Sequence, residues 1–387
     1  MTVNIIRRAS SLPRVVSPRR ALEQVIVLAS VVGTIWWLVA STTANLNARG
    51  VATGFAFLAK PASLGISESW ISFTPSVDTY AVVLLAGLVN TLYVSALAIL
   101  LATIIGVVIG LSRLSSNWLL SRSAGVYVEL IRNVPLPLQL LLWYQILLNL
   151  PPPRNAISIG GSIALSNRGL FISSIVWREM HLLAAIGLLL LALVIAGRRW
   201  RSARLGDSAA TSRPVAIAIW LAAALLIVIV AWNTEFEAPA LRGFNFSGGS
   251  RLSPELAALV TGLSLYAAAF IGEIVRGGIL AVPAGQWEAG TSLGLNRPQI
   301  LRKIIFPLSL RLVIPPLASE YLSTIKNSSL AVIIGYPELT ALVNTMLADT
   351  GQPIEAIAVL MLAYLTVSIA VSSVMNWYER HTELIKR

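Results

Sequence analysis

Six polar side chains interrupt two apolar stretches of this chain and could bind a small polar solute. Glu320 can accept hydrogen bonds from a cation, and Lys326 can donate them to an anion. Charged groups in an apolar run are costly in lipid and usually face protein or a water-filled cavity. We therefore predict a polar path, with an internal Glu320–Lys326 ion pair as the alternative role of those two residues. The predicted path residues are Asn133, Ser319, Glu320, Lys326, Asn327 and Ser328.

Prolines lie beside both groups of polar residues. Pro135 follows Asn133, and Pro315 and Pro316 precede Ser319. A proline inside a helix removes a backbone hydrogen bond and commonly kinks or breaks the helix. We expect both helices to be broken at these points, so that freed backbone groups add to the path.

Further ionisable residues stand near the ends of apolar runs. Glu129 and Arg132 precede Pro135, while Glu273 and Arg276 close a later run. Glu129 and Arg132 either face the path or lie at the level of the lipid headgroups, and the sequence favours neither position.

The elements that must position these groups are membrane-spanning helices. Of the 387 residues, 56% are hydrophobic and only 12% are charged, whereas soluble domains contain about 25% charged residues. We therefore predict an all-α polytopic membrane protein with about eight spans. The predicted spans cover residues 21–40, 80–111, 125–150, 181–196, 214–232, 256–280, 311–334 and 354–375.

The net charge of +12 does not indicate a nucleic-acid-binding protein. The basic residues cluster in short segments beside alternate apolar runs, which is the pattern of cytoplasmic loops. This alternation predicts a multi-pass protein of the bacterial inner membrane with both termini cytoplasmic.

Catalytic and cofactor motifs are absent from the sequence. There are no cysteines, and His181 and His381 are too far apart in sequence to suggest a metal site. No G-x-x-x-x-G-K-[ST] motif is present, so the chain has no phosphate loop with which to hydrolyse ATP. We expect no enzymatic activity and no cofactor in this chain.

The segment PAGQWEAGTSLGLNRPQILRKIIFP, residues 283–307, is a polar hairpin between two apolar runs. Residues 286–293 read as a short surface helix, which Gly294 can end in the left-handed conformation. Asn296 can cap a second helix that has a proline in its first turn. We expect Pro307 to stop that helix. The two short helices would form a rigid, compact knob, whereas the alternative is an ordinary basic loop.

The knob resembles the coupling loop of transmembrane subunits of bacterial ABC importers. That loop reads Glu-Ala-Ala, three residues, Gly, nine residues, Ile, one residue and Leu-Pro, and the spacing here is the same. Gly290 and Phe306 depart from the usual Ala and Leu, and Gly290 weakens the first helix by roughly 1 kcal/mol relative to Ala. The matching residues are Glu288-Ala289-Gly290, Gly294, Ile304 and Phe306-Pro307. The resemblance implies contacts with a separate ATPase through Glu288, Ala289, Gly290, Gly294, Arg302 and Pro307.

Four other segments resemble the polar amino acid permeases of the same importers. These segments, residues 87–99, 127–144, 268–279 and 314–330, lie in the second, third, sixth and seventh predicted spans, which with the eighth correspond to the five-helix core of that family. The outside segment SESWISFTPSVDTY resembles the general L-amino-acid permease subgroup, whose two permease subunits differ. Asn327 replaces the usual Asp, so we expect no strong preference for cationic side chains from this subunit alone.

The resemblance implies a domain map with the type I ABC importer transmembrane fold. A basic cytoplasmic N-terminus precedes an extra first helix and a periplasmic loop, and a permease domain and a cytoplasmic tail follow. An insert of two extra helices at about 181–232 and the coupling loop 283–307 lie inside the permease domain. The four parts are residues 1–20, 21–79, 80–376 and 377–387.

The function implied is that of a permease subunit in an ATP-driven importer of L-amino acids. Its implied partners are an ABC ATPase dimer that holds ATP and Mg, a second and different permease chain, a periplasmic amino-acid-binding protein and membrane lipid. The predicted path suits a zwitterion, since it offers an acceptor for the ammonium and donors for the carboxylate. An ion-coupled secondary amino acid transporter is the alternative, although it would not need the spaced coupling loop.

Overall fold

The fold is that of a helical membrane protein, seen in a computed structural model that describes residues 18–48, 50, 53–175 and 236–382. Within these residues, four helices are long and apolar enough to cross a membrane, which confirms the corresponding predicted spans. The predicted spans at 181–196 and 214–232 lie outside the described residues. The four helices are α1 (Pro18–Ala48), α2 (Tyr80–Ser112), α7 (Pro254–Leu280) and α12 (Pro353–Thr382).

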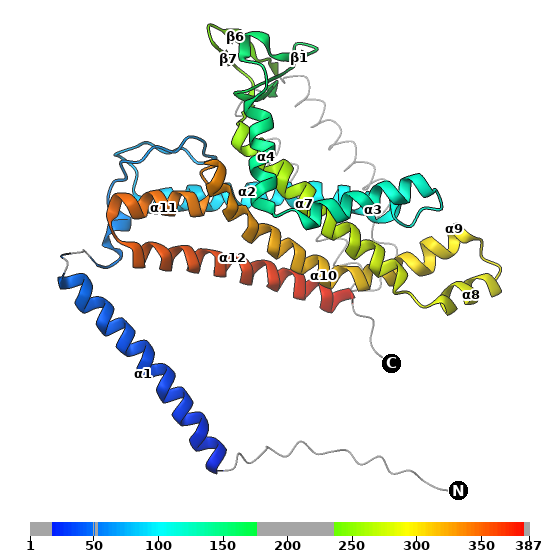
Figure 1. Cartoon of the computed structure of the whole chain (residues 1–387), viewed down its shortest axis with the longest axis horizontal. Helices are drawn as coiled ribbons and strands as arrows, with labels where there is room; N and C mark the ends of the chain where they lie inside the picture. Colours follow the sequence, from blue (N-terminus) through cyan, green and yellow to red (C-terminus); the bar gives the residue numbers. More distant parts are fainter. Residues whose placement is uncertain (1–17, 49, 51–52, 176–235, 383–387) are drawn as a thin grey trace, which may run out of the picture.

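The centre of the bundle is the contact between α2 and α7. A Cβ on Gly106 would lie 2.7 Å from the side chain of Ile271, and one on Gly110 would lie 2.7 Å from the carbonyl oxygen of Gly272. The absence of side chains at these two positions therefore lets the helix backbones approach closely, as small residues do between membrane helices. The helices α2, α7, α10 and α12 run in roughly one direction (Figure 1).

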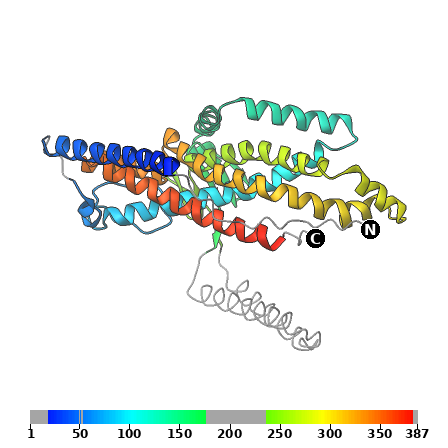
Figure 2. The same ribbon diagram turned by 90° about the horizontal axis from the view of Figure 1, so that it is seen from below.

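The run at 125–150 is not one span. It forms α3 (Trp118–Asn133) and α4 (Leu136–Leu148), and α4 stands across the direction of α3 (Figures 1 and 2). Val134, which precedes the proline, is extended with φ −93° and ψ 127°, as the clash with a following proline ring favours. The break predicted at Pro135 is confirmed, but its consequence is a change of direction rather than a kinked span.

The break predicted at Pro315 and Pro316 is wrong. Both residues lie inside α10 (Phe306–Asn327), which continues through them. Val313 and Ala318 are buried on either side of the prolines, so tertiary packing holds the turns that have lost hydrogen bonds. The regular helix instead ends at the 3₁₀ segment η4 (Ser328–Ile334).

A helix that the sequence did not predict follows η4. The predicted outside loop contains α11 (Leu339–Thr350), which is bent by 51° from the helix before it. Glu338 lies fully buried at its N-cap and accepts a hydrogen bond from the backbone N–H of Ala341 at 2.8 Å. Asp349, also assigned to the loop, lies in α11 and is hydrogen-bonded to Tyr80.

The outside loops predicted at 151–179 and 233–253 contain short strands, so the protein is not purely α-helical. Four of them form an antiparallel sheet in the order β1-β2-β3-β8, and two further pairs lie beside it, β4-β5 and β6-β7. The β3–β8 pair brings together the two ends of the segment that holds the predicted insert. The strands are β1 (Ile157–Ile159), β2 (Ile163–Ser166), β3 (Gly169–Ile172), β4 (Ser174–Ile175), β5 (Phe236–Glu237), β6 (Ala240–Arg242), β7 (Asn245–Ser247) and β8 (Ser250–Leu252).

The loop before α2 covers one end of the bundle. It contains η1 (Phe55–Ala59), whose Phe57 is buried in a cluster with residues of α2, α11 and α12. The backbone N–H of Gly54 donates a 2.7 Å hydrogen bond to Glu355 of α12. This end of the bundle is therefore closed by packed structure, whereas the knob projects from the opposite end (Figure 1).

Candidate functional site

The knob begins with α8 (Ala284–Ser292), close to the predicted bounds. Gly294 follows in the left-handed conformation, with φ +71°. The N–H of Leu295 donates to the carbonyl of Gly290 at 3.1 Å, and the N–H of Gly294 donates to that of Thr291 at 2.9 Å. These two bonds are the pair that closes a helix C-terminus around a glycine, so the predicted role of Gly294 is confirmed.

The second helix, α9 (Arg297–Ile300), begins at the predicted cap. Asn296 accepts a hydrogen bond from the N–H of Gln299, and the Gln299 side chain accepts one from the N–H of Asn296, both at 3.0 Å. This reciprocal capping box fixes the direction in which the chain leaves the turn. Local sequence is therefore enough to specify the tip of the knob.

The prediction that Pro307 stops the second helix is wrong. A π-helical turn, η3 (Leu301–Ile305), leads from α9 into α10, and Pro307 lies in the first turn of α10. Because the residues before α10 are already helical, Pro307 lies inside a continuous helical stretch, where it removes one backbone hydrogen bond without ending the helix. The knob and the seventh predicted span are thus parts of one helical stretch, Arg297–Ile334.

A small apolar core holds the knob against the span ends. Val282, Ile300 and Ile305 are each no more than 5% exposed, and Trp287 packs against them. Gly290 faces this core, because a Cβ placed on it would lie 2.9 Å from Cγ1 of Ile300. The glycine that replaces the usual alanine therefore makes room for Ile300.

Alanine at position 290 is expected to destabilise the knob by about 1 kcal/mol. Overpacking against Ile300 costs about 1–3 kcal/mol, of which the better helix propensity of alanine returns about 1 kcal/mol. Gly285→Ala is the matched control, because its Cβ would meet nothing within 4 Å. Hydrogen exchange of the α8 amides should become faster in Gly290→Ala and slower in Gly285→Ala. Equal changes in the two variants would contradict the packing explanation.

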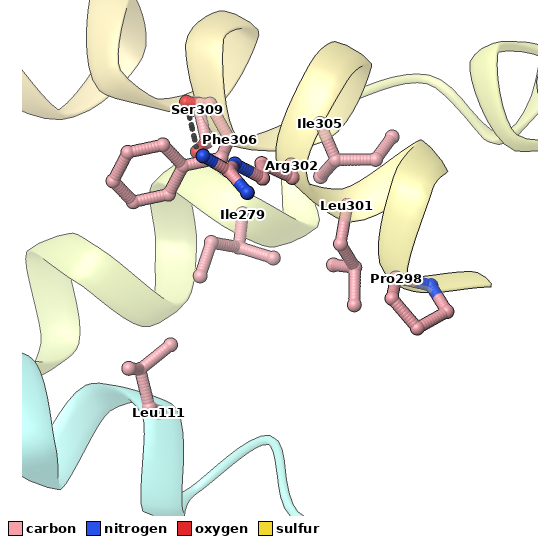
Figure 3. Close-up of a pocket in the computed structure, with 8 residues that line it drawn as sticks. All are labelled: Leu111, Ile279, Pro298, Leu301, Arg302, Ile305, Phe306 and Ser309. Carbon is pink, nitrogen blue, oxygen red and sulfur yellow. Dashed lines mark hydrogen bonds between the residues drawn. The ribbon is translucent and has the colours of Figure 1, made fainter.

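The predicted coupling residues do not share one surface. Glu288 and Ala289 are exposed on α8, whereas Gly290 is buried. Arg302 lies at the base of the knob, beside an apolar groove (Figure 3). The part of the knob that a partner could contact directly is therefore the exposed face of α8 together with Leu293, which is 76% exposed.

An ion cluster joins α2 and α7 near the knob. Glu273 of α7 pairs with Arg113 of α2. The same carboxylate accepts a 3.1 Å hydrogen bond from Nε of Arg276, one turn further along α7. One acidic group thus links the ends of two spans through Arg113 and Arg276.

One residue of the predicted path, Glu320, lies near other charged and aromatic side chains. This half-buried carboxylate of α10 interacts electrostatically with Arg132 of α3. The Arg132 guanidinium lies 4.9 Å from the ring centre of Phe270, and Tyr266 of α7 is close enough to interact with both charges. Three separate helices therefore contribute to this cluster, in which the exposed Arg132 lies within electrostatic range of Glu320.

The other predicted path residues divide into two faces of α10. Glu320 and Asn327 are half-buried and two helical turns apart, whereas Ser319 and Lys326 lie on the neighbouring exposed face. Glu320 and Lys326 form no ion pair among the described residues, so the alternative pairing is wrong. Asn133 is exposed at the end of α3, and Ser328 is buried with its hydroxyl donating to the carbonyl of Ile325 at 2.7 Å. The assignment of all six to a path stays a prediction.

Sequence reasoning left out two groups that the fold makes important. The sequence leaves open whether Arg132 faces the path or the headgroups, and the fold brings it within electrostatic range of Glu320. Glu338 was placed in a loop, although an acidic residue before the apolar pattern Leu339, Leu342, Val343 is a recognisable helix start. Its second carboxylate oxygen accepts a 3.0 Å hydrogen bond from Tyr364 of α12.

Comparisons with known proteins give a consistent picture. Residues 218–383 match the family described as binding-protein-dependent transport system inner membrane component. The chain is 44% identical over 384 residues to the amino-acid ABC transporter permease protein YhdX of Escherichia coli. The alignment covers 95% of this chain and 95% of that protein.

Two further relatives also match over nearly their whole length. The general L-amino acid transport system permease protein AapQ of Rhizobium johnstonii is 40% identical over 380 residues, covering 95% of this chain and 93% of that protein. The glutamate/glutamine/aspartate/asparagine transport system permease protein BztB of Rhodobacter capsulatus is 33% identical over 402 residues, covering 94% and 93%.

Proposed function

This chain belongs to the family of amino-acid ABC transporter permeases, and on that premise we propose that it moves L-amino acids inward through the Glu320 region while a separate ATPase drives the knob. The family supplies the class of protein: a membrane permease of an ABC transporter. The substrate, the direction and the partners of this chain are the proposed part. Broad or polar L-amino acids are the proposed substrates because the relatives are named for them.

The observation that carries the proposal is the continuity of the knob with α10. The helical stretch Arg297–Ile334 begins in the knob and includes Glu320. At 1.5 Å per residue, about 35 Å of helix separates Arg297 from Glu320. A displacement of the knob therefore moves the helix that carries Glu320. This is the kind of rigid element through which one site can bias a two-state packing at another.

The polar cluster supports an amino acid as the solute. An α-ammonium group needs a carboxylate such as Glu320, and an α-carboxylate needs a donor such as Arg132. The Arg132 charge acts on the Glu320 carboxylate, so a zwitterion bound between them could place its ammonium group on Glu320 and its carboxylate on Arg132. Lys326 and Asn327, further along α10, would then meet the solute on its way to or from this cluster.

The proposed partners are an ABC ATPase dimer, a second permease chain and a periplasmic amino-acid-binding protein. The ATPase would hold ATP and Mg and would contact the exposed face of α8. The second permease would cover the exposed face of α10 that carries Ser319 and Lys326. Because the sequence has no cysteines, single introduced cysteines can report these contacts without background.

The test is reconstitution of the purified assembly in liposomes with ATP enclosed. Amino acids delivered by the binding protein should raise the ATPase rate, and Ala289→Cys should cross-link to the ATPase subunit. Uptake that continues without ATP but stops when the ion gradient is collapsed would contradict the proposal and favour an ion-coupled carrier.

The proposed orientation places the knob in the cytoplasm and the η1 loop in the periplasm. We expect a membrane-impermeant maleimide to label Val77→Cys in cells whose outer membrane has been made permeable. Leu293→Cys should react only after the inner membrane is also opened. Val77 and Leu293 are 70% and 76% exposed, so in cells that lack the partner ATPase subunit the membrane alone sets access to the reagent. Labelling of Leu293→Cys in closed cells would overturn the orientation.

A further inference from the structure

A groove of about 410 Å³ lies where the knob meets the ends of two spans (Figure 3). Its walls come from Leu111 of α2, Ile279 of α7 and the η3–α10 junction, which contributes Leu301, Ile305 and Phe306. These walls are aliphatic or aromatic. The volume is within the range of sites that hold small molecules, and the lining is suited to a hydrocarbon chain.

The polar groups of the groove are few. The Ser309 hydroxyl donates to the carbonyl of Phe306 at 3.0 Å and is therefore already engaged. Arg302 supplies the one charge among the lining residues, and its guanidinium lies close to Phe306 and Ser309 in Figure 3. Within the described part of the chain, no carboxylate lies within ion-pairing distance of Arg302. The groove thus combines an apolar floor with a cation that has no acidic partner there.

The surroundings of the groove are those of a lipid-facing surface near the headgroups. Leu111 and Phe306 are 52% and 58% exposed, and Val108 and Leu280 beside them are exposed to a similar degree. In a membrane protein such side chains meet acyl chains. The span α2 ends one residue after Leu111, where Arg113 begins the polar turn. A phosphate at this level would be within the headgroup region while its acyl chains remained in the hydrocarbon.

We propose that this groove binds an anionic phospholipid of the cytoplasmic leaflet, with an acyl chain along the apolar floor and the phosphate on Arg302. Basic pockets at the cytoplasmic ends of membrane helices suit anionic headgroups, because the arginine gains a partner without leaving the interface. The choice of leaflet rests on the proposed orientation. The binding itself depends only on the groove.

The occupant would touch both sides of the junction that transmits motion. Leu111 and Ile279 belong to spans, whereas Leu301 and Arg302 belong to the π-helical turn of the knob. Single π turns occur frequently at functional sites. A lipid seated here would make the position of the knob sensitive to the composition of the membrane.

The test measures lipid retained by the purified full chain, by native mass spectrometry with dioleoyl-phosphatidylglycerol or dioleoyl-phosphatidylcholine. The wild-type chain should retain phosphatidylglycerol about fivefold better than phosphatidylcholine, because one arginine near the headgroups favours an anionic lipid by about that factor. Arg302→Gln should abolish that preference. Lys303→Gln, a matched loss of charge at an exposed neighbour outside the groove, should change retention less than twofold. Leu111→Trp should fill the groove and lower the retention of both lipids.

Three results would overturn the proposal. If Arg302→Gln and Lys303→Gln lower the retention of phosphatidylglycerol equally, the preference would come from general surface charge and not from the groove. Equal retention of dihexanoyl- and dioleoyl-phosphatidylglycerol would show that the groove does not hold an acyl chain. Displacement of the lipid by a bound ATPase subunit would make the groove a protein interface. None of these measurements requires transport, so they can contradict lipid binding without contradicting the proposed function.

Discussion

Replacing Glu320 with arginine is expected to lower amino-acid uptake by about 100-fold in reconstituted liposomes. The change places a second cation beside Arg132. An unpaired charge within a membrane helix costs about 2.5–3.5 kcal/mol, and each 1.4 kcal/mol corresponds to about tenfold. Glu320→Gln removes the carboxylate without adding a second cation. It should reduce uptake far less.

A charge exchange separates an ion pair from direct contact with the solute. If Glu320 and Arg132 chiefly hold α10 against α3, Glu320→Arg combined with Arg132→Glu should recover much of the lost uptake. If Glu320 binds the ammonium group of the solute, the exchange should leave uptake low and raise KM in the milder variant Glu320→Gln. A double variant with the same uptake as wild type, together with an unchanged KM in Glu320→Gln, would remove Glu320 from the path.

Replacing Ile305 with alanine is expected to uncouple ATP hydrolysis from the solute. Ile305 is 1% exposed in the core that joins the knob to α10. Truncation of a buried isoleucine costs about 2–5 kcal/mol, which would let the knob move independently of the helix behind it. The stimulation of the ATPase rate by amino acids should fall at least about tenfold. The packing energy lost at Ile305 exceeds the 1.4 kcal/mol that corresponds to a factor of about ten.

The control for this prediction is Leu310→Ala. Leu310 lies on the same helix and is 39% exposed, so its truncation removes the same number of atoms without opening the knob core. Assembly with the ATPase, measured by co-purification, should be retained in both variants. If both lose amino-acid stimulation equally, the helix rather than the knob core would be responsible. If neither does, the lever proposed here is wrong.

Local signals in the sequence gave the correct structure wherever a few adjacent residues decide the outcome. The tip of the knob is specified by Gly294 and by the Asn296–Gln299 capping box, whose hydrogen bonds span only three residues. The long apolar helices were also predicted, because their length and composition are set by the membrane rather than by neighbours. The motif spacing of the knob was enough to indicate the family that the comparisons then showed.

Predictions that depended on prolines were less successful. The same signal was read at Pro135 and at Pro315-Pro316, yet only the first ends a helix. At Pro135 the Gln139 side chain donates to the carbonyls of Ile131 and Val134 at 2.9 and 2.8 Å, which satisfies backbone groups at the break. At Pro315 the flanking turns are fixed by packing against α7. Val313 lies so close to Gly278 of α7 that a Cβ added to Gly278 would be 2.2 Å from Cγ2 of Val313. The two prolines therefore differ in their surroundings: a side chain caps the freed carbonyls at Pro135, whereas α10 packs against α7 at Pro315.

The sequence by itself determined that the chain is a helical membrane protein, that it carries a two-helix knob, and which polar residues interrupt its spans. Tertiary structure alone decided that the knob continues into α10, that α4 turns across α3, and that Arg132 lies beside Glu320. The physical reason is how far apart in the sequence the interacting residues lie. Caps, turns and apolar runs depend on residues within a few positions of one another, whereas the meeting of Arg132, Tyr266 and Glu320 depends on how three separate helices pack.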